Sequence, residues 1–583
     1  MPLEKETQTS HTVVGIAVKD HKKWYLKPLT PGYKDNIPFN GKVTLKQGEI
    51  VRAKIKIAKS GSLSVQIESR IKTHNEVDRA IKSFLLVHNV PHDDWDSKVT
   101  DYPETVNPSA LKRRRDLRNL AFVTIDGETA KDFDDAIYVE KTNAVDWKLF
   151  VAIADVAHYV KVDSPLDVEA KRRGNSVYLP DFVITMLPEE LSNGICSLNP
   201  SVDRLVVVCE MDIDANGNTT SYSFYDAVIH SAGRLTYTEV NRISTSQLPA
   251  RSNAINNSLS EFYKLYRCLR QRREERGALD FTPHTSEVRV ADGEPVRVGV
   301  LVQNDAHRMI EEAMIAANIC AAKYLQEQGL NGMYRIHDKP DSESIGTLQA
   351  VLNQCNLQID RKLTATPKDF QLVLNKLRES GAQSWIWEIQ VLRALTQAQY
   401  AFDNRGHFGL ALQDYAHFTS PIRRYSDLYV HRLVKSTFKS KLQQDQPVSA
   451  AQRELGIHLS ECERRAEIVS RRVDSWLKCS LLKKYVGKAF WGYVVSVEEF
   501  GLFVEIDDFY IAGLIHISEL GKEYFVYRSS NLCGWKTDKT YSLGDRLQVT
   551  VTGVDVESAQ LDLVETCNYT TEYRTRKQYR DDF

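Results

Sequence analysis

The chain has 583 residues, of which 42% are hydrophobic and 26% charged, a composition that supplies several cores and excludes collagen-like and disordered proteins. The formal net charge of −1 conceals a basic front and an acidic tail: residues 1–100 carry 17 Lys and Arg against 11 Asp and Glu, and residues 486–583 carry 10 against 16. No apolar stretch reaches the roughly 18 residues of a membrane span, and MPLEKETQTSHTVV lacks the apolar segment of a signal peptide, so we expect a cytoplasmic protein without a membrane partner.

The first segment predicts a β-barrel. Between Thr12 and Ile71, short β-branched runs alternate with Gly, Pro and Asn, and the runs are TVVGIAVK, KWYLKPL, GKVTLKQ, IVRAKIKIA and LSVQIESRI. Five short strands with Trp24, Tyr25 and neighbouring lysines suit an OB or cold-shock-like barrel that binds single-stranded RNA, within residues 1–91. A barrel that serves only as a structural cap is the alternative.

Residues 92–120 are polar and predict a linker, which contains the basic run Lys112–Arg115. Such a run is more often a solvated surface than a binding element.

Residues 121–485 mix strands with helical patterns, and this mixture predicts one large α+β domain. The strands are LAFVTID, WKLFVAIADVAHYV and RLVVVCEMDI, and the helices include RMIEEAMIAANICAAKYLQEQ and SDLYVHRLVKSTFKSKL.

From Val486 a second series of strands predicts an OB-fold barrel over residues 486–570, followed by a short tail over 571–583. Its runs are AFWGYVVSVEE, GLFVEID, YIAGLIHIS, RLQVTVTGVD and LDLVE. Within them Phe500, Phe503 and His516 occupy positions suited to stacking on RNA bases, which would have to outweigh the acidic charge of this region.

Four aspartates in FVTIDGETAKDFDDAIYVEK lie within ten residues, at positions 126, 132, 134 and 135. Carboxylates so close repel one another and partly protonate unless a hard cation neutralises them, so we expect a divalent metal. Paired metal ions can activate a water and stabilise the leaving oxygen of a phosphodiester. On spacing alone, a metal-dependent phosphoryl-transfer site, a structural calcium loop and a solvated acidic turn all remain open.

A second informative stretch is YAHFTSPIRRYSDLYVHR, in which Pro421 prevents a preceding helix and Arg423 and Arg424 open a new one. Guanidinium groups at a helix start are well placed to bind phosphate, and ion pairs with neighbouring helices are the alternative. His417 and His431 flank the stretch without the spacing of a zinc site.

These motifs resemble the RNase II and RNase R family of exoribonucleases. RRDLRNLAFVTIDGETAKDFDDAIYVE is similar to the opening of the family's catalytic RNB domain. RGNSVYLP, MLPEELSNGICSL, RGALDF, IEEAMIAAN and YAHFTSPIRRYSDLYVHR resemble its later landmarks, in the family's order, from about Arg114 to Lys484. The last barrel is similar to the OB-type RNA-binding repeat first described in a ribosomal protein.

The resemblance implies processive hydrolysis of single-stranded RNA from the 3′ end to nucleoside 5′-monophosphates. It implies magnesium, with manganese as an alternative metal, no small-molecule cofactor, a monomer and a role in RNA turnover. The four aspartates would form the metal site: Asp126, Asp132 and Asp135 would hold the ions, and Asp134 would be the carboxylate most critical for the chemical step. Arg423 would contact the scissile phosphate.

The resemblance also assigns RNA contacts outside the aspartate cluster. Tyr178 and Phe281 would clamp the terminal bases. Tyr237 and one of Glu311 and Glu312 would read the ribose 2′-hydroxyl. Without the resemblance, the aromatic residues could equally well be core residues, and the two glutamates could be exposed positions on a helix.

In one respect the chain departs from its expected relatives, which commonly carry two cold-shock-type barrels before the catalytic domain. About 110 residues precede that domain here, room for one barrel and a linker, which leaves open how much RNA is held outside the catalytic channel. A catalytically silent RNA-binding protein and a metal-dependent DNA exonuclease are the rival interpretations. The intact aspartates with Arg423 count against the first, and the ribose-reading residues count against the second.

Overall fold

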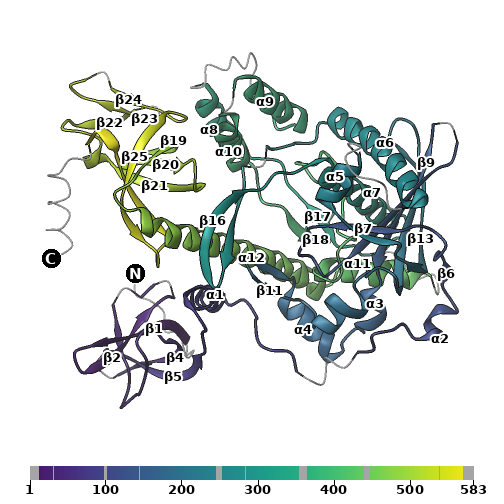
Figure 1. Cartoon of the computed structure of the whole chain (residues 1–583), viewed down its shortest axis with the longest axis horizontal. Coiled ribbons are helices and arrows are strands. Elements are labelled where there is room, and N and C mark those ends of the chain that lie inside the picture. Colours follow the sequence, from purple (N-terminus) through teal and green to yellow (C-terminus); the bar gives the residue numbers. More distant parts are fainter. Residues whose placement is uncertain are drawn as a thin grey trace.

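The structure is a computed structural model that describes residues 12–568, apart from positions 31, 34, 59, 97–101, 144, 245–251, 283, 354–363, 382, 439–446, 529 and 538. The expected fold class is confirmed: an N-terminal β-barrel-like sheet, a central α+β region and a C-terminal closed barrel follow one another (Figure 1). None of the helices in these described ranges is long and apolar enough to cross a membrane.

The N-terminal sheet has five strands in the order β3-β2-β1-β4-β5. They are β1 (Thr12–Asp20), β2 (Lys23–Pro28), β3 (Ile37–Pro38), β4 (Ile50–Ile57) and β5 (Leu63–Ile71). The two edges approach each other at a single bridge between Phe39 and Val65. The expected strand GKVTLKQ is wrong: Leu45 is buried in the barrel core without pairing in the sheet, and Gly41 and Gly48 at its ends both take left-handed backbone angles that interrupt a strand.

The central region is built on a seven-stranded sheet in the order β14-β7-β8-β9-β12-β13-β6. These strands are β6 (Arg115–Asp116), β7 (Val123–Asp126), β8 (Asp135–Lys141), β9 (Trp147–Ala154), β12 (Asp203–Ile213), β13 (Thr219–His230) and β14 (Gly233–Thr236). Two long helices, α6 (Asn253–Arg276) and α7 (Asp305–Glu327), pack on the sheet through β8, β9 and β12. The largest hydrophobic core lies between these layers.

Shorter elements surround the sheet and complete the central region. The helices are α2 (Pro108–Leu111), α3 (Val156–Tyr159), α4 (Pro165–Arg173), α5 (Tyr237–Ser244), α8 (Ser342–Leu352), α9 (Pro367–Glu379), α10 (Ser384–Arg393) and α11 (Tyr425–Thr437). The strand pairs are β10 (Val177–Leu179) with β11 (Phe182–Ile184), β15 (Ser286–Ala291) with β16 (Glu294–Val300), and β17 (Tyr334–Ile336) with β18 (Gln399–Ala401). A short helical turn spans Glu190–Ile195.

Two expectations for the central region need correction. The run WKLFVAIADVAHYV is not one strand, because the Asp155 carboxylate caps α3 by accepting the His158 N–H at 3.2 Å. The basic run before Leu120 is not wholly solvated: Arg114 is 5% exposed and pairs with Asp155, and β6, which begins at Arg115, joins the edge of the central sheet. The stretch expected as a linker therefore ends inside the central fold.

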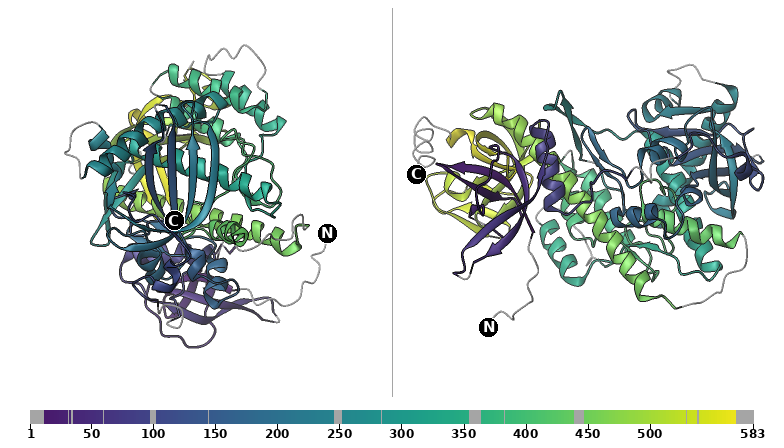
Figure 2. Two further views of the ribbon diagram at one scale, coloured as in Figure 1. Left: turned by 90° about the vertical axis from the view of Figure 1, so that its right-hand side faces the viewer. Right: turned by 90° about the horizontal axis from the view of Figure 1, so that it is seen from below.

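Helix α12 (Ala450–Leu482) connects all three regions. It contacts α1 (Glu76–Val87), β10 and β18 of the central region, and β25 of the last barrel. The right panel of Figure 2 shows α12 passing beside α1 on its way to the C-terminal barrel. The apolar face of α12 thus holds the flanking β-structures against the central region.

The C-terminal barrel is closed, in the order β19-β20-β21-β26-β25, and carries a small additional sheet, β22-β23-β24. The barrel strands are β19 (Ala489–Glu498), β20 (Gly501–Ile506), β21 (Ile511–His516), β25 (Arg546–Asp555) and β26 (Gln560–Glu565). The added strands, which the sequence patterns did not indicate, are β22 (Phe525–Arg528), β23 (Asn531–Gly534) and β24 (Thr540–Tyr541). Leu481 and Leu482 of α12 extend the barrel core.

Candidate active site

The four aspartates of the D-x5-D-x-D-D motif lie on one strand connection. Asp126 ends β7 and Asp135 begins β8, with Asp132 and Asp134 on the loop between these neighbouring strands. Two anchors hold the loop: the Phe133 N–H donates to Ser197 Oγ at 3.0 Å, and the Ala154 N–H donates to the Asp134 carbonyl at 2.8 Å.

The positive charge of Arg423 and Arg234 offsets the burial and mutual repulsion of the aspartates only in part. One oxygen of each of Asp126, Asp134 and Asp135 is buried and has no hydrogen-bond partner. Burial, reinforced by repulsion from Asp132, raises the pKa of Asp126 to about 6. Burial, reinforced by repulsion from Asp126, raises the pKa of Asp135 to about 8, and burial raises the pKa of Asp134 well above its usual range. Unpartnered carboxylate oxygens are the ligands that hard divalent cations prefer, so the donor set fits such an ion.

The aspartate carboxylates do not yet converge on a single position where a metal ion could bind. Within the described ranges, no three His, Cys, Asp or Glu side chains form a complete metal-binding group. The Tyr178 hydroxyl donates to Asp132 Oδ2, and burial together with this carboxylate raises the pKa of Tyr178. A cation would therefore compete with the Tyr178 hydroxyl for Asp132.

Arg423 lies against the aspartate cluster because the turn before α11 is bonded to it. The Ile422 N–H donates to Asp134 Oδ1 at 2.8 Å, and Arg423 Nε lies 3.6 Å from Asp134 Oδ2. The Ser176 N–H donates to the Arg423 carbonyl at 3.0 Å, which ties the turn to the strand that carries Tyr178. The Arg423 side chain remains 44% exposed and can reach a ligand.

Arg424 has a different environment from its neighbour. Its Nε and Nη2 donate to the two carboxylate oxygens of Asp427 at 2.9 and 2.7 Å, and Asp427 is fully buried. Arg424 is thus ion-paired, but to the first turn of α11, which it caps, and not to a neighbouring helix as the alternative had it. The expected contact between Arg424 and RNA remains a prediction.

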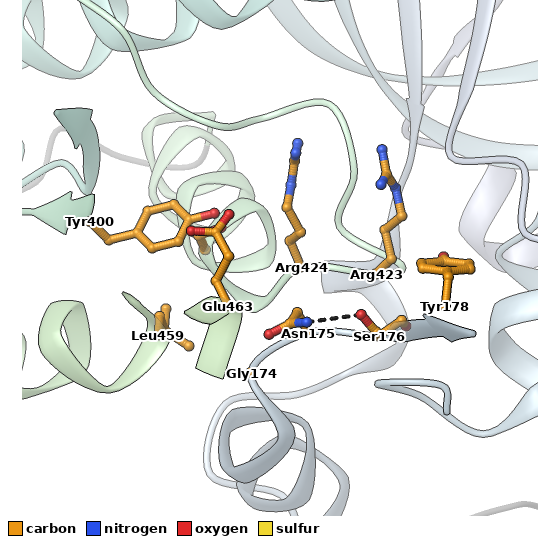
Figure 3. Close-up of a pocket in the computed structure, with 10 residues that line it drawn as sticks. Gly174, Asn175, Ser176, Tyr178, Tyr400, Arg423, Arg424, Leu459 and Glu463 are labelled. Atoms are coloured by element: carbon orange, nitrogen blue, oxygen red, sulfur yellow. Dashed lines mark hydrogen bonds between the residues drawn. The ribbon is translucent and has the colours of Figure 1, made fainter. Parts of the chain in front are cut away.

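A cavity of about 190 Å³ extends from Arg423 toward α12 (Figure 3). Arg423 and Arg424 run in parallel along one wall, Tyr178 stands beside Arg423, and Tyr400 and Glu463 lie at the other end. The cavity lining is Gly174, Asn175, Ser176, Tyr178, Tyr400, Arg423, Arg424, Ser426, Leu459 and Glu463. Asn175 belongs to the RGNSVYLP motif, whereas no motif in the sequence indicated Tyr400 or Glu463.

Tyr237 reaches the site through strand pairing. Strand β14 runs parallel to β7 with Thr236 opposite Asp126, so Tyr237 emerges beside the aspartates. Its ring stacks on His307 of α7 with centroids 3.8 Å apart and planes at 17°. Arg234, which sequence reasoning missed, donates to the carbonyls of Gly127 and Glu128 at 2.9 and 2.6 Å and steadies the same loop.

Glu311 and Glu312 face different surroundings although both pair with Arg273, at 2.6 and 2.9 Å. The Glu311 side chain is 45% exposed and lines a cavity of about 210 Å³ together with Phe281. Glu312 is 3% exposed, so the expectation of solvent exposure is wrong for it. The structure places Phe281 in a different cavity from Tyr178 and packs it against the core of α8, α9 and α10.

The three barrel residues expected to stack on bases form one cluster. Phe500 and Phe503 meet edge to face with centroids 6.1 Å apart, and Phe500 is 48% exposed. Gly501 pairs with His516 across β20 and β21, and the Ile517 N–H donates to the Phe500 carbonyl at 2.8 Å. The cluster is accessible at one end of the barrel.

Comparison with known proteins agrees with this arrangement. The family model for the RNB domain matches residues 114–440, more than half of the chain, and the S1 RNA binding domain matches residues 483–564. The chain belongs to the RNB family that includes ribonuclease R. Ribonuclease R of Escherichia coli (strain K12) is 42% identical over 501 residues, which cover 83% of this chain and 61% of the relative.

Other ribonuclease R proteins match more of their own length. That of Aquifex aeolicus is 36% identical over 564 residues, which cover 94% of this chain and 80% of the relative. The structure of Mycoplasma genitalium RNase R in complex with ribose methylated single-stranded RNA superposes with a TM-score of 0.88 at 29% identity, covering 95% of this chain and 89% of that one. The RNB family assignment therefore rests on sequence and fold together.

Proposed function

We propose that this RNB-family chain is a processive, hydrolytic 3′-to-5′ exoribonuclease that degrades single-stranded RNA to nucleoside 5′-monophosphates. It acts with magnesium, as a monomer, in cytoplasmic RNA turnover. The observation that carries the proposal is the set of three buried, unpartnered aspartate oxygens beside the exposed guanidinium of Arg423. The single-stranded RNA in the related Mycoplasma genitalium structure supports the substrate class.

Asp126, Asp132, Asp134 and Asp135 would hold the metal, after Asp132 exchanges the Tyr178 hydroxyl for the ion. When bound, magnesium supplies a more acidic water and positive charge for the oxygens of the phosphodiester. A bound cation would also offset the repulsion between the carboxylates, which together with burial raises the pKa values of Asp126 and Asp135.

The chain's own residues would orient the scissile phosphate. Arg423 donates to its non-bridging oxygens and stabilises the charge that builds up as the bond to phosphorus forms. The Ile422 N–H holds Asp134 Oδ1, while Oδ2, which accepts no hydrogen bond, lies 3.6 Å from Arg423 Nε. Cleavage of the P–O3′ bond releases a nucleoside 5′-monophosphate and leaves a 3′-hydroxyl on the shortened RNA.

Ribose recognition would fall to Tyr237 and Glu311. Tyr237 emerges beside Asp126, and Glu311 is the exposed member of its pair. Glu312 is buried against Arg273, so it supports the position of Glu311 and does not reach RNA directly. An acceptor positioned for the 2′-hydroxyl discriminates against DNA because its own hydrogen bond is lost with deoxyribose.

The remaining contacts would hold the strand. Tyr178 and Phe281 stack on bases near the 3′ end, Arg424 lies behind Arg423, and the cluster of Phe500, Phe503 and His516 stacks on bases further along the strand. Aromatic stacking is tolerant of base identity, which suits degradation of many RNAs.

A single assay tests the proposal against its rivals. RNA and DNA of the same sequence, labelled at the 5′ end, are incubated with the protein and magnesium or EDTA. We expect a ladder of 5′-labelled products, shortened from the 3′ end, only in the reaction that contains both RNA and magnesium. Binding without shortening would identify a silent RNA-binding protein, and equal shortening of DNA would identify a general exonuclease; either result overturns the proposal.

A further inference from the structure

A second cavity, of about 350 Å³, is lined by α6, α7 and the turn between β12 and β13. Helices α6 and α7 and strand β13 lie on the right of Figure 1. Residues 411–414 close one side of it. It shares no lining residue with the cavity at Arg423. Its volume falls in the range of roughly 300 to 1,000 Å³ that is typical of small-molecule sites.

Arg276 gives this cavity an unusual charge. Its Nε donates to the Leu410 carbonyl at 3.0 Å, whereas its Nη2 is buried and has no partner. In the described part of the chain no carboxylate lies within ion-pair distance of it: Glu312 on the same wall pairs with Arg273 at 2.9 Å and acts on Arg276 only as a more distant charge. Burial lowers the pKa of Arg276 to about 10. A half-buried guanidinium with a buried, unpartnered N–H and no ion pair gains from an anionic ligand.

Two further cations line the same cavity. Lys323 is exposed on α7 and makes no ion pair or hydrogen bond to any described residue. Arg272, one turn before Arg276, lies 3.6 Å from Glu275 and is half exposed. The lining carboxylate of Asp414 is already engaged, because its Oδ1 accepts the side-chain amides of Gln326 and Asn404 at 2.7 and 2.8 Å.

We propose that this cavity binds a phosphate monoester. The guanidinium of Arg276 and the ammonium of Lys323 would hold the phosphate oxygens, because an arginine fork matches phosphate geometry and lysine adds a mobile charge. Thr219 and Gln413 in the lining supply further donors, and Tyr222, Leu269 and Ile315 provide an apolar wall for the rest of the ligand. The proposal does not depend on the chain's catalytic activity.

The test is calorimetric titration of the full chain in EDTA with inorganic phosphate, ribose 5-phosphate, AMP and uncharged adenosine. The Arg423→Ala background removes the phosphate contact that we propose at the active site. We expect AMP to bind and adenosine not to bind. Arg276→Gln and Lys323→Ala should each weaken AMP binding at least tenfold, whereas Arg267→Ala, an exposed position on α6 outside the cavity, should leave it unchanged.

The compounds also separate the sources of phosphate. Tighter binding of AMP than of inorganic phosphate supports a nucleotide ligand held by the apolar wall, and equal binding supports a site for the phosphate group alone. Absence of binding, or affinity that neither Arg276→Gln nor Lys323→Ala changes, would overturn the proposal. Because Lys323 is exposed, Lys323→Ala keeps the test valid if Arg276→Gln does not fold. RNA hydrolysis, measured separately, can fail without affecting this result.

Discussion

Asp134 has one contact that asparagine can keep and a charge that asparagine lacks. Its Oδ1 accepts the Ile422 N–H at 2.8 Å, a bond that the amide oxygen of Asp134→Asn preserves. We expect RNA binding to persist and turnover to fall by roughly a hundredfold or more, since a charge needed around the metals is removed. Filter binding and single-turnover cleavage at saturating magnesium measure the two effects. Near-normal cleavage would sink the assignment, and Asp403→Asn, at an 84% exposed side chain, is the control.

The raised pKa values of Asp126 and Asp135 predict how stability depends on pH. Because the folded-state pKa values, about 6 and about 8, lie above the unfolded value, the protonated forms favour folding. In EDTA, the free energy of unfolding should therefore fall as pH rises from the ordinary carboxyl pKa of 3.8 to about 8, and magnesium should raise the Tm more at pH 8.5 than at pH 6.

Scanning calorimetry of the wild type and Asp135→Asn at both pH values isolates this effect from other titrating groups. The variant should show a higher Tm in EDTA at pH 8.5 and a smaller response to magnesium. If the Tm of the two proteins depends on pH in the same way, the pKa of Asp135 is not raised in the folded state.

Tyr178 can act through its ring or through its hydroxyl, and two variants distinguish these roles. Stacking is worth about 1 to 3 kcal/mol per base, and short RNA has few other contacts. Tyr178→Ala should therefore still degrade long RNA but release longer final fragments, as measured on gels. Tyr178→Phe keeps the ring and loses the bond to Asp132, so its fragments should match those of the wild type. Unchanged fragment length with a collapsed rate for Tyr178→Ala would contradict the clamp.

At the scale of elements, the end of α4 fastens the Arg423 turn to α12. Gly174 has a φ of +75°, its carbonyl accepts the Tyr425 N–H at 2.9 Å, and an added Cβ would lie 2.6 Å from the Cys462 side chain. Gly174→Ala should destabilise the fold by about 2 kcal/mol or more, through backbone strain and overpacking.

Denaturant unfolding measures this loss. Gly346→Ala is the control, because Gly346 lies in α8 with no atom near the added Cβ, and alanine there should be neutral or stabilising by up to about 1 kcal/mol. Equal stabilities for the two variants would show that the junction at Gly174 relaxes without cost.

At the scale of the whole molecule, the RNA contacts that we propose for the C-terminal barrel lie far along the chain from the aspartates. Deleting residues 486–583 should weaken RNA binding more than it slows cleavage at saturating RNA. The deletion also exposes Leu481 and Leu482 of α12, which pack in the barrel core. The double substitution Phe500→Ala and His516→Ala avoids this exposure. It should weaken binding of long RNA by roughly tenfold, at about 1 to 3 kcal/mol per stacked base, and leave single-turnover cleavage unchanged.

Filter binding beside single-turnover kinetics measures the two quantities. Tyr524→Ala, at a 78% exposed aromatic outside this cluster, is the matched control and should bind normally. Unchanged affinity of the double variant would show that the barrel is structural or binds a protein.

Local patterns determined much of the fold and the choice of chemistry. Period-two runs and turn residues located nearly all strands of both barrels, because each strand's alternation is written in its own residues. The D-x5-D-x-D-D spacing indicated the acidic site for the same reason, since all four aspartates lie on one strand connection. The run GKVTLKQ misled because burial alone, without sheet pairing, produces the same alternation.

Tertiary structure alone decided which groups are paired and which are free. Adjacent residues on a helix project about 100° apart, so Glu311 faces a cavity while Glu312 is buried, and no pattern distinguishes them. Arg423 is exposed beside Asp134 whereas Arg424 is locked to Asp427, and Arg276 is left without a counter-ion. The contacts of Arg423 with Asp134 and of Arg276 with the Leu410 carbonyl join segments more than a hundred residues apart, whereas the Arg424–Asp427 pair forms within one helical turn. The free energy of each charge depends on such contacts and on burial more than on the identity of its neighbours in the sequence.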